Sequence, residues 1–140
     1  MTAFVTDTFT DTNGTAITSH TGELGATWAI WTPGNSATTP NVIQSNLLIS
    51  AEVNTNAWYY ASGTPSSADY TVSANLVYIS AIPHDTQLQA VMARGSAGVL
   101  TCYTAWLTDK VSLYKYITGS ATLLADIVIP SFSSDTYTLV

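Results

Sequence analysis

The chain has 140 residues and a formal net charge of −6, and only 9% of its residues are charged, against about 25% in an average globular protein. Three basic residues are too few to neutralise a phosphate backbone, which excludes nucleic acid and anionic membranes as partners. Uncharged hydroxyl and β-branched side chains suit the solvent face of a pleated sheet better than they suit a helix. Length and composition therefore predict one all-β domain over residues 1–140.

The expected elements are strands throughout, because turn signals recur roughly every eight to twelve residues and no helical apolar period is sustained. A polar connection over residues 10–25 contains the turn dipeptide Asn13-Gly14, and Ser45-Asn46 is typical of a tight hairpin. In chain order, strands are expected at residues 3–9, 26–31, 42–44, 47–53, 57–62, 69–81, 86–94, 99–107, 111–117, 121–129 and 136–140.

The clearest strand covers residues 69–81, where apolar and polar side chains alternate. Tyr70, Val72 and Leu76 share one parity, while Thr71 and Asn75 have the other. A period of two residues indicates a strand with one buried face. The last strand, 136–140, is followed by no turn, so we expect its edge to pair with another chain or with a further segment.

The single cysteine, Cys102, excludes an internal disulfide. It lies in an apolar run and is expected to be a buried small hydrophobe and not a reactive thiol. The N-terminus lacks the basic and apolar regions of a secretory signal peptide, and no apolar run approaches the roughly 18 residues of a membrane span.

A resemblance to a known family rests on the segment DTFTDTNGT over residues 7–15, together with His20, Gly25 and Trp28. This set resembles the opening of concanavalin A-like jelly-roll domains, which are frequent in bacteriophage structural proteins and in modules attached to secreted glycosidases. The similarity continues through residues 44–47, 59–60, 69–74, 91–94 and 111–115.

The resemblance implies an antiparallel jelly-roll β-sandwich and implies that His20 hydrogen-bonds the long N-terminal loop. Family members continue past the final Tyr-Thr-Leu strand, so the sandwich is expected to be incomplete at its C-terminus. Hydrolases of the family carry Glu-x-Asp-x-x-Glu on one strand. This chain has only Glu23 and Glu52 as glutamates and no carboxylate pair at that spacing.

Other catalytic arrangements are also not expected. Neither His20 nor His84 lies beside a Gly-x-Ser-x-Gly nucleophile pattern. We therefore predict that the chain is not an enzyme.

One candidate metal site is Asp11 with Asn13, which offer oxygen atoms at alternate positions before Gly14. The rest of a calcium loop is missing, because no glutamate follows at its twelfth position. A turn stabilised by the Asp and Asn side chains is favoured, with a weak calcium site as the alternative. No other cofactor is expected.

Large aromatic rings are the most suggestive feature for binding. Exposed Trp and Tyr rings stack on sugars, and the candidates are Trp31, Trp58, Tyr60 and Trp106. Adjacent residues of a strand point to opposite faces, so at least one ring of the run Trp58-Tyr59-Tyr60 should face outward. The alternative is that these rings belong to the core or to a subunit interface.

Together these features predict a non-enzymatic surface protein of a bacteriophage virion, extracellular after lysis, of the capsid-decoration (cement) or fibre type. Its expected partners are copies of itself, in a homo-oligomer such as a trimer, and capsid or tail proteins. The alternative is a carbohydrate-binding module of a secreted hydrolase or adhesin, with a surface glycan as its ligand.

Overall fold

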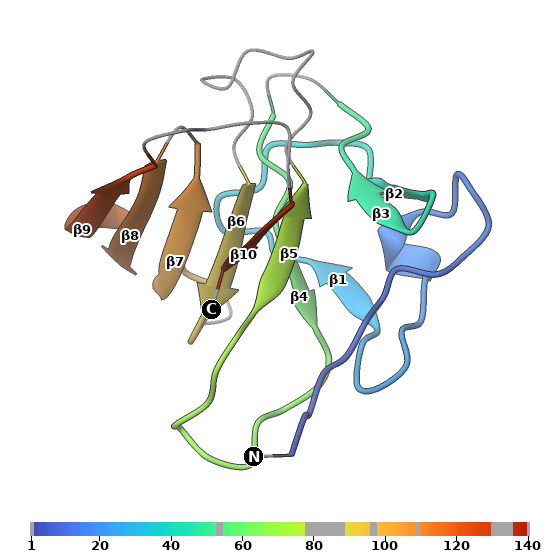
Figure 1. Ribbon diagram of the computed structural model, residues 1–140, viewed down its shortest axis with the longest axis horizontal. Helices are drawn as coiled ribbons and strands as arrows, with labels where there is room; N and C mark the ends of the chain where they lie inside the picture. Colours follow the sequence, from blue (N-terminus) through green and yellow to red (C-terminus); the bar gives the residue numbers. More distant parts are fainter. Residues whose placement is uncertain are drawn as a thin grey trace. The chain divides into compact units, whose positions relative to one another are not determined.

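The computed structural model describes residues 2–52, 55–77, 89–95, 98–108, 110–129 and 136–139. In these ranges the chain forms ten β-strands and one short 3-10 helix, and all strand pairs are antiparallel (Figure 1). The prediction of an all-β protein is therefore confirmed. None of the helices in the described part of the chain is long and apolar enough to cross a membrane.

The chain divides into two compact units, Met1–Tyr70 and Thr71–Val140, which we call unit 1 and unit 2. The prediction that residues 1–140 form a single domain stays a prediction.

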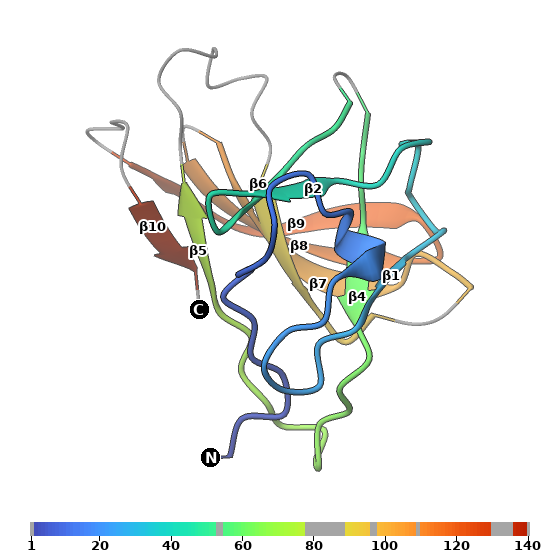
Figure 2. The ribbon, with the colours of Figure 1, turned by 90° about the vertical axis from the view of Figure 1, so that its right-hand side faces the viewer.

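Unit 1 contains two short strand pairs and the 3-10 helix η1 (Ile17–Ser19). Strand β1 (Trp28–Ile30) pairs with β4 (Tyr59–Ala61), and β2 (Val42–Gln44) pairs with β3 (Leu47–Ile49). In Figure 2, η1 lies beside β1.

The β2–β3 hairpin turns through Ser45 and Asn46, whose φ angles of 53° and 61° are those of the two-residue hairpin turn that matches strand twist. The tight hairpin expected at Ser45-Asn46 is confirmed.

The core of unit 1 is small and is built as much by loops as by strands. Ile17 and Ile43 are fully buried, and Ala26 and Trp31 are nearly so. Backbone hydrogen bonds link the loops across the core, from Ile43 N to Thr15 O at 2.8 Å and from Ile17 N to Asn41 O at 2.9 Å. The loops of unit 1 are therefore fixed by specific bonds.

The prediction of a strand at residues 3–9 is wrong. Among the described residues this segment makes a single isolated bridge, Thr6 to Leu24, and Phe9 has a φ of 52°, outside the β region. Side-chain hydrogen bonds to Asp7 hold the segment in an irregular path, as described below, and these replace the ladder that an alternating pattern suggests.

Unit 2 contains a four-stranded antiparallel sheet and a two-stranded pair. The sheet has the order β6 (Gln89–Ala93), β7 (Cys102–Leu107), β8 (Lys110–Ile117) and β9 (Ser120–Val128). Strand β5 (Ala74–Val77) pairs with β10 (Thr136–Leu139), and Gln89 Nε2 donates to Val77 O at 2.7 Å.

The C-terminal strand β10 thus pairs with β5 of its own chain on one side, and the expectation that its edge pairs with another chain or a further segment stays a prediction for the other side. The alternation expected around β5 is confirmed, because Val72, Ala74 and Leu76 are half-buried and Thr71, Ser73 and Asn75 are exposed. The part of that prediction at residues 78–81 lies outside the described residues.

Candidate functional site

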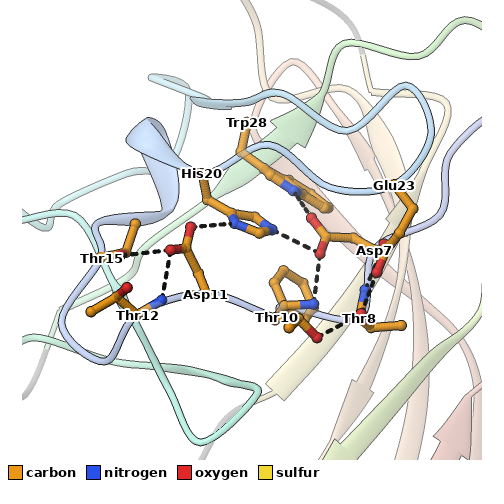
Figure 3. A network of polar contacts seen from close by, with 10 residues as sticks. Asp7, Thr8, Thr10, Asp11, Thr12, Thr15, His20, Glu23 and Trp28 are labelled. Carbon is orange, nitrogen blue, oxygen red and sulfur yellow. Dashed lines mark hydrogen bonds and ion pairs between the residues drawn. The ribbon is translucent and has the colours of Figure 1, made fainter.

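A polar network in unit 1 is centred on His20, which lies between two carboxylates (Figure 3). Its Nδ1 is 2.9 Å from Asp11 Oδ2 and its Nε2 is 3.0 Å from Asp7 Oδ1. The His20 and Asp7 side chains are each only 3% exposed, while that of Asp11 is 31% exposed. His20 therefore joins two points of the N-terminal segment, as the family resemblance implied.

Local structure places each member of this network. His20 follows η1 directly and caps it, with its N–H donating to Ile17 O. Asp7 Oδ1 accepts a 2.6 Å hydrogen bond from Phe9 N, which holds Phe9 at its positive φ. Asp7 Oδ2 accepts a 2.5 Å hydrogen bond from Trp28 Nε1 at the start of β1.

Gly22 is required by the same arrangement. A Cβ at residue 22 would lie 2.5 Å from Asp7 Oδ2 and 2.8 Å from the Ala26 Cβ. Both distances are far inside van der Waals contact, so a larger residue would displace the Asp7 carboxylate.

The network favours a charged imidazole. Burial by itself lowers the pKa of His20, but its hydrogen bonds to Asp11 and Asp7 together outweigh this effect and raise the pKa above 6.5. The pKa of Asp11 is lowered by its bonds to His20 and to Thr12 N. Because a neutral imidazole carries one N–H only, a proton on each nitrogen is needed to donate to both carboxylates.

This network stabilises the fold of unit 1. Both His20 nitrogens are engaged by carboxylates and the residue is 4% exposed, so a substrate has no access to the imidazole. Its bonds tie residues 7–11 to η1 and to β1, elements that are otherwise joined by few backbone bonds.

The two predicted metal ligands, Asp11 and Asn13, lie in the same loop but serve different contacts. Asp11 Oδ1 accepts from Thr12 N at 2.6 Å, and Asn13 Oδ1 accepts from Ser45 N at 2.9 Å. The described residues contain no group of three His, Cys, Asp or Glu side chains that could hold a metal ion. Asp11 thus supports the turn and Asn13 fastens it to the β2–β3 hairpin, while a weak calcium site stays an untested prediction.

Both glutamates of the chain stabilise loops in unit 1. Glu23 accepts hydrogen bonds from Thr8 N and Thr8 Oγ1. Glu52 accepts from Thr38 Oγ1 and from the Thr38 and Thr39 amides, which lowers its pKa to about 2. Each carboxylate therefore accepts hydrogen bonds from a loop segment that lies 13 to 15 residues away in the sequence.

Three of the four predicted sugar-stacking rings lie in unit 1, around β1 and β4. Trp31 and Trp58 meet edge to face, with ring centroids 5.8 Å apart, but Trp31 is only 5% exposed. Tyr60 is 48% exposed and points away from the face that carries Tyr59, as strand alternation requires. Tyr60 is therefore the ring of this group that is presented to solvent.

The fourth ring, Trp106, lies on β7 in unit 2 and belongs to a different cluster. Its ring centroid is 5.4 Å from that of Tyr114 and 6.4 Å from that of Tyr116, with the Tyr116 ring stacked at 17°. These tyrosines were missed in the sequence. They could have been found from their equal parity on β8, which places them on the face of Trp106 in an antiparallel pair.

The register separates the two faces of the four-stranded sheet. One face, here the Trp106 face, carries Trp106, Tyr114 and Tyr116 together with the buried residues Cys102, Thr104 and Ser112. The opposite face, here the Tyr103 face, is exposed over much of its area: Tyr103 is 38%, Leu113 37%, Ile117 50% and Ile127 65% exposed, whereas Leu107 on the same face is buried.

Strand β9 is exposed along all nine residues and forms the end of this sheet (Figure 1). Leu123 and Leu124 are each 48% exposed, and Val128 is 73% exposed. Its register on β8 shifts between Leu113 and Tyr114, which leaves Leu124 as an extra residue, a β-bulge. The bulge reverses the alternation of side chains beyond Leu124, and both faces of the strand carry large apolar side chains: Leu123 and Val128 on the Trp106 face and Ile127 on the Tyr103 face.

Comparison of the chain with protein-family models, with curated proteins and with solved structures finds no match.

Proposed function

We propose that this chain is a non-enzymatic structural protein of a virion surface, of the capsid-decoration or fibre type, which works as an assembled oligomer. The observation that carries the proposal is the exposed apolar strand β9, with Ile127 and Val128 at 65% and 73% exposure. We further propose the finer architecture of a jelly-roll sandwich and the location on a bacteriophage particle. Both rest on the sequence resemblance.

Burial of β9 supplies the driving force for assembly. The largest apolar patch of a monomer is about 300–600 Å² and is often a binding site. Covering roughly 300 Å² of apolar surface contributes roughly 7 kcal/mol before the cost of association. A free strand edge adds unpaired backbone donors and acceptors, which are a template for pairing with another chain.

The charge content of the chain agrees with this role. Charged side chains are depleted at the centres of protein interfaces, and only 9% of this chain is charged. The described carboxylates that carry shifted pKa values bind His20, threonines, or the Lys110–Ser112 pair. These acids therefore stabilise loops and strands of the chain itself.

The solution mass of the purified chain tests the proposal. Light scattering at micromolar concentrations should give a stable, closed oligomer such as a trimer or a dimer. Association with a free energy of only about 4 kcal/mol is detectable at about 1 mM. A mass of one copy at every concentration up to about 1 mM would therefore contradict the proposal that the protein assembles.

A glycan-binding module is the second candidate, favoured by the exposed Tyr60 and by the Trp106 cluster with its two tyrosines. Calorimetry with a panel of saccharides should then show millimolar-to-micromolar binding that is weakened by Tyr60→Ala or Trp58→Ala. Tyr103→Ala removes another exposed strand tyrosine and is the matched control. Absence of heat with every saccharide would reject this candidate.

A further inference from the structure

The outer edge of β9 is an exposed strand edge that is long and largely apolar. On one side β9 pairs with β8 from Ser120 to Val128, and on the other side none of the described strands lies against it. We propose that a second copy of this chain pairs its own β9 with this edge, antiparallel and about a twofold axis. The inference rests on the proposed function, because it names the contact through which the protein assembles.

The length of the strand suits this mode of recognition. Nine residues at about 3.3 Å each extend for roughly 30 Å, and alternate residues direct N–H and C=O groups away from β8. An added strand gains affinity from those main-chain bonds and specificity from its side chains. Pairing joins two four-stranded sheets into one continuous sheet across the twofold axis.

The distribution of charge is compatible with a second copy as the partner and favours the antiparallel direction. Asp126 is the only charged residue of β9, and it is paired with Lys110 Nζ at 2.7 Å and with Ser112 Oγ at 2.5 Å. The other half of the strand, residues 120–123, carries no charge. Antiparallel pairing about an axis near Leu124, the middle of the strand, places Asp126 against that uncharged half of the partner. Parallel in-register pairing would place like charges opposite each other, which destabilises a sheet.

The side chains are also suited to self-pairing. Because of the bulge at Leu124, Leu123 and Val128 lie on the Trp106 face while Ala125 and Ile127 lie on the Tyr103 face. A paired β9 therefore supplies apolar neighbours on both faces of the new sheet. A partner strand with alternating polar residues would leave one of these faces uncovered.

The experiment compares the wild-type chain with Ile127→Lys and with Leu47→Lys. A lysine on an edge strand is the substitution that blocks edge pairing, and Ile127 is exposed enough that its replacement leaves the fold intact. Leu47, 37% exposed at the start of β3 in unit 1, is a matched apolar-to-lysine control. Ala121→Lys, at the other end of the β9 edge, is a second test variant.

Sedimentation and amide hydrogen exchange are measured from about 10 μM to 1 mM, and circular dichroism verifies the fold of each variant. We expect wild type and Leu47→Lys to self-associate with concentration-dependent protection of the β9 amides. Both β9 variants should raise the dissociation constant at least about tenfold, a loss of 1.4 kcal/mol.

Two results would overturn the inference and they are distinguishable. In the first result, both β9 variants form an oligomer of the same mass as wild type, and the β9 amides exchange equally fast at all concentrations. This result rejects β9 pairing but leaves the proposed function standing. A wild-type chain that stays a single copy throughout the range rejects β9 pairing and the assembling function together.

Discussion

Removal of the His20 imidazole tests the role of the polar network in unit 1. His20→Ala would leave the buried Asp7 carboxylate, 3% exposed, without its counter-charge. Breaking a buried charge pair from one side costs about 3–5 kcal/mol. Since single domains are stable by about 5–15 kcal/mol, this loss is a large part of the stability of the unit.

Chemical unfolding followed by tryptophan fluorescence measures this effect. Three of the four tryptophans, Trp28, Trp31 and Trp58, belong to unit 1, and Trp28 donates directly to Asp7. Glu23→Gln is the matched control, because Glu23 is hydrogen-bonded to Thr8 near the network. Glutamine keeps one side-chain oxygen as an acceptor for Thr8, and Glu23 is exposed, so this change should lower the free energy of unfolding by no more than about 1 kcal/mol, well below the loss expected for His20→Ala.

The pH dependence of the same measurement identifies the charged form of His20. Its folded pKa is raised above 6.5, so its stabilisation is complete below pH 6.5 and is lost as the pH rises through the folded pKa. The Asp11 pKa is lowered below 3.8, so its contribution is present above pH 3.8 and is lost as the pH falls through the folded value. We expect wild-type stability to fall on the alkaline side of this window.

The loss of stability above pH 6.5 should disappear in His20→Ala and persist in His84→Asn, the control for the second histidine of the chain. If His20→Ala lowers the free energy of unfolding by less than about 1 kcal/mol, the inference that His20 and Asp7 form a buried charge pair is refuted. An unchanged alkaline slope in that variant would refute the charged imidazole.

Three further substitutions or treatments test neighbouring features. Gly22→Ala should lower the free energy of unfolding by about 1–3 kcal/mol, because its Cβ would lie 2.5 Å from Asp7 Oδ2, and an unchanged value would contradict the packing of the network. Thr104→Val should raise it by about 1 kcal/mol, because the buried Thr104 Oγ1 has no hydrogen-bond partner in the described structure, and a decrease would reveal one. The Cys102 thiol is 2% exposed and its pKa is raised by burial, so a disulfide reagent should label it only after unfolding; rapid labelling of the native chain would contradict this.

Strand positions in unit 2 were predictable from the sequence because each is a local pattern. The strands expected at residues 99–107, 111–117 and 121–129 match β7, β8 and β9 closely. Their turns are local too, as in Thr118-Gly119, where φ angles of 47° and 85° form a tight hairpin. Short-range periodicity and turn chemistry are sufficient for this kind of element.

The N-terminal segment shows why the same reasoning failed for residues 3–9. Their alternation resembles a strand, but Asp7 binds His20 and Trp28, which are 13 and 21 residues away. Bonds over such separations have no local signal, and they override the β preference of the segment. His20 itself was identified through the family resemblance, while its partners Asp7 and Trp28 became evident in the structure.

For the aromatic candidates, too, the sequence predicted the direction of a side chain along a strand but not its burial by distant segments. Parity along Trp58-Tyr59-Tyr60 correctly required an outward ring, and Tyr60 is that ring. The burial of Trp31 depends on how loops pack around its ring, and the alternation of side chains along a strand gives no information on that packing. On β9, the bulge at Leu124 changes parity within the strand, so an alternating pattern read from the sequence would assign half of its side chains to the wrong face.

The scarcity of charge in the sequence and the open edge in the structure are connected. Proteins that keep a sheet edge free of partners usually place lysines, prolines or inward-pointing charges on it. β9 has no lysine and no proline, and its one charge, Asp126, is held by Lys110 and Ser112 of β8. Asp126 and the bulge at Leu124 are the protective features of β9, and the rest of the strand carries apolar side chains on both faces. An edge with so little protection against association favours a chain that is covered by a partner when it functions.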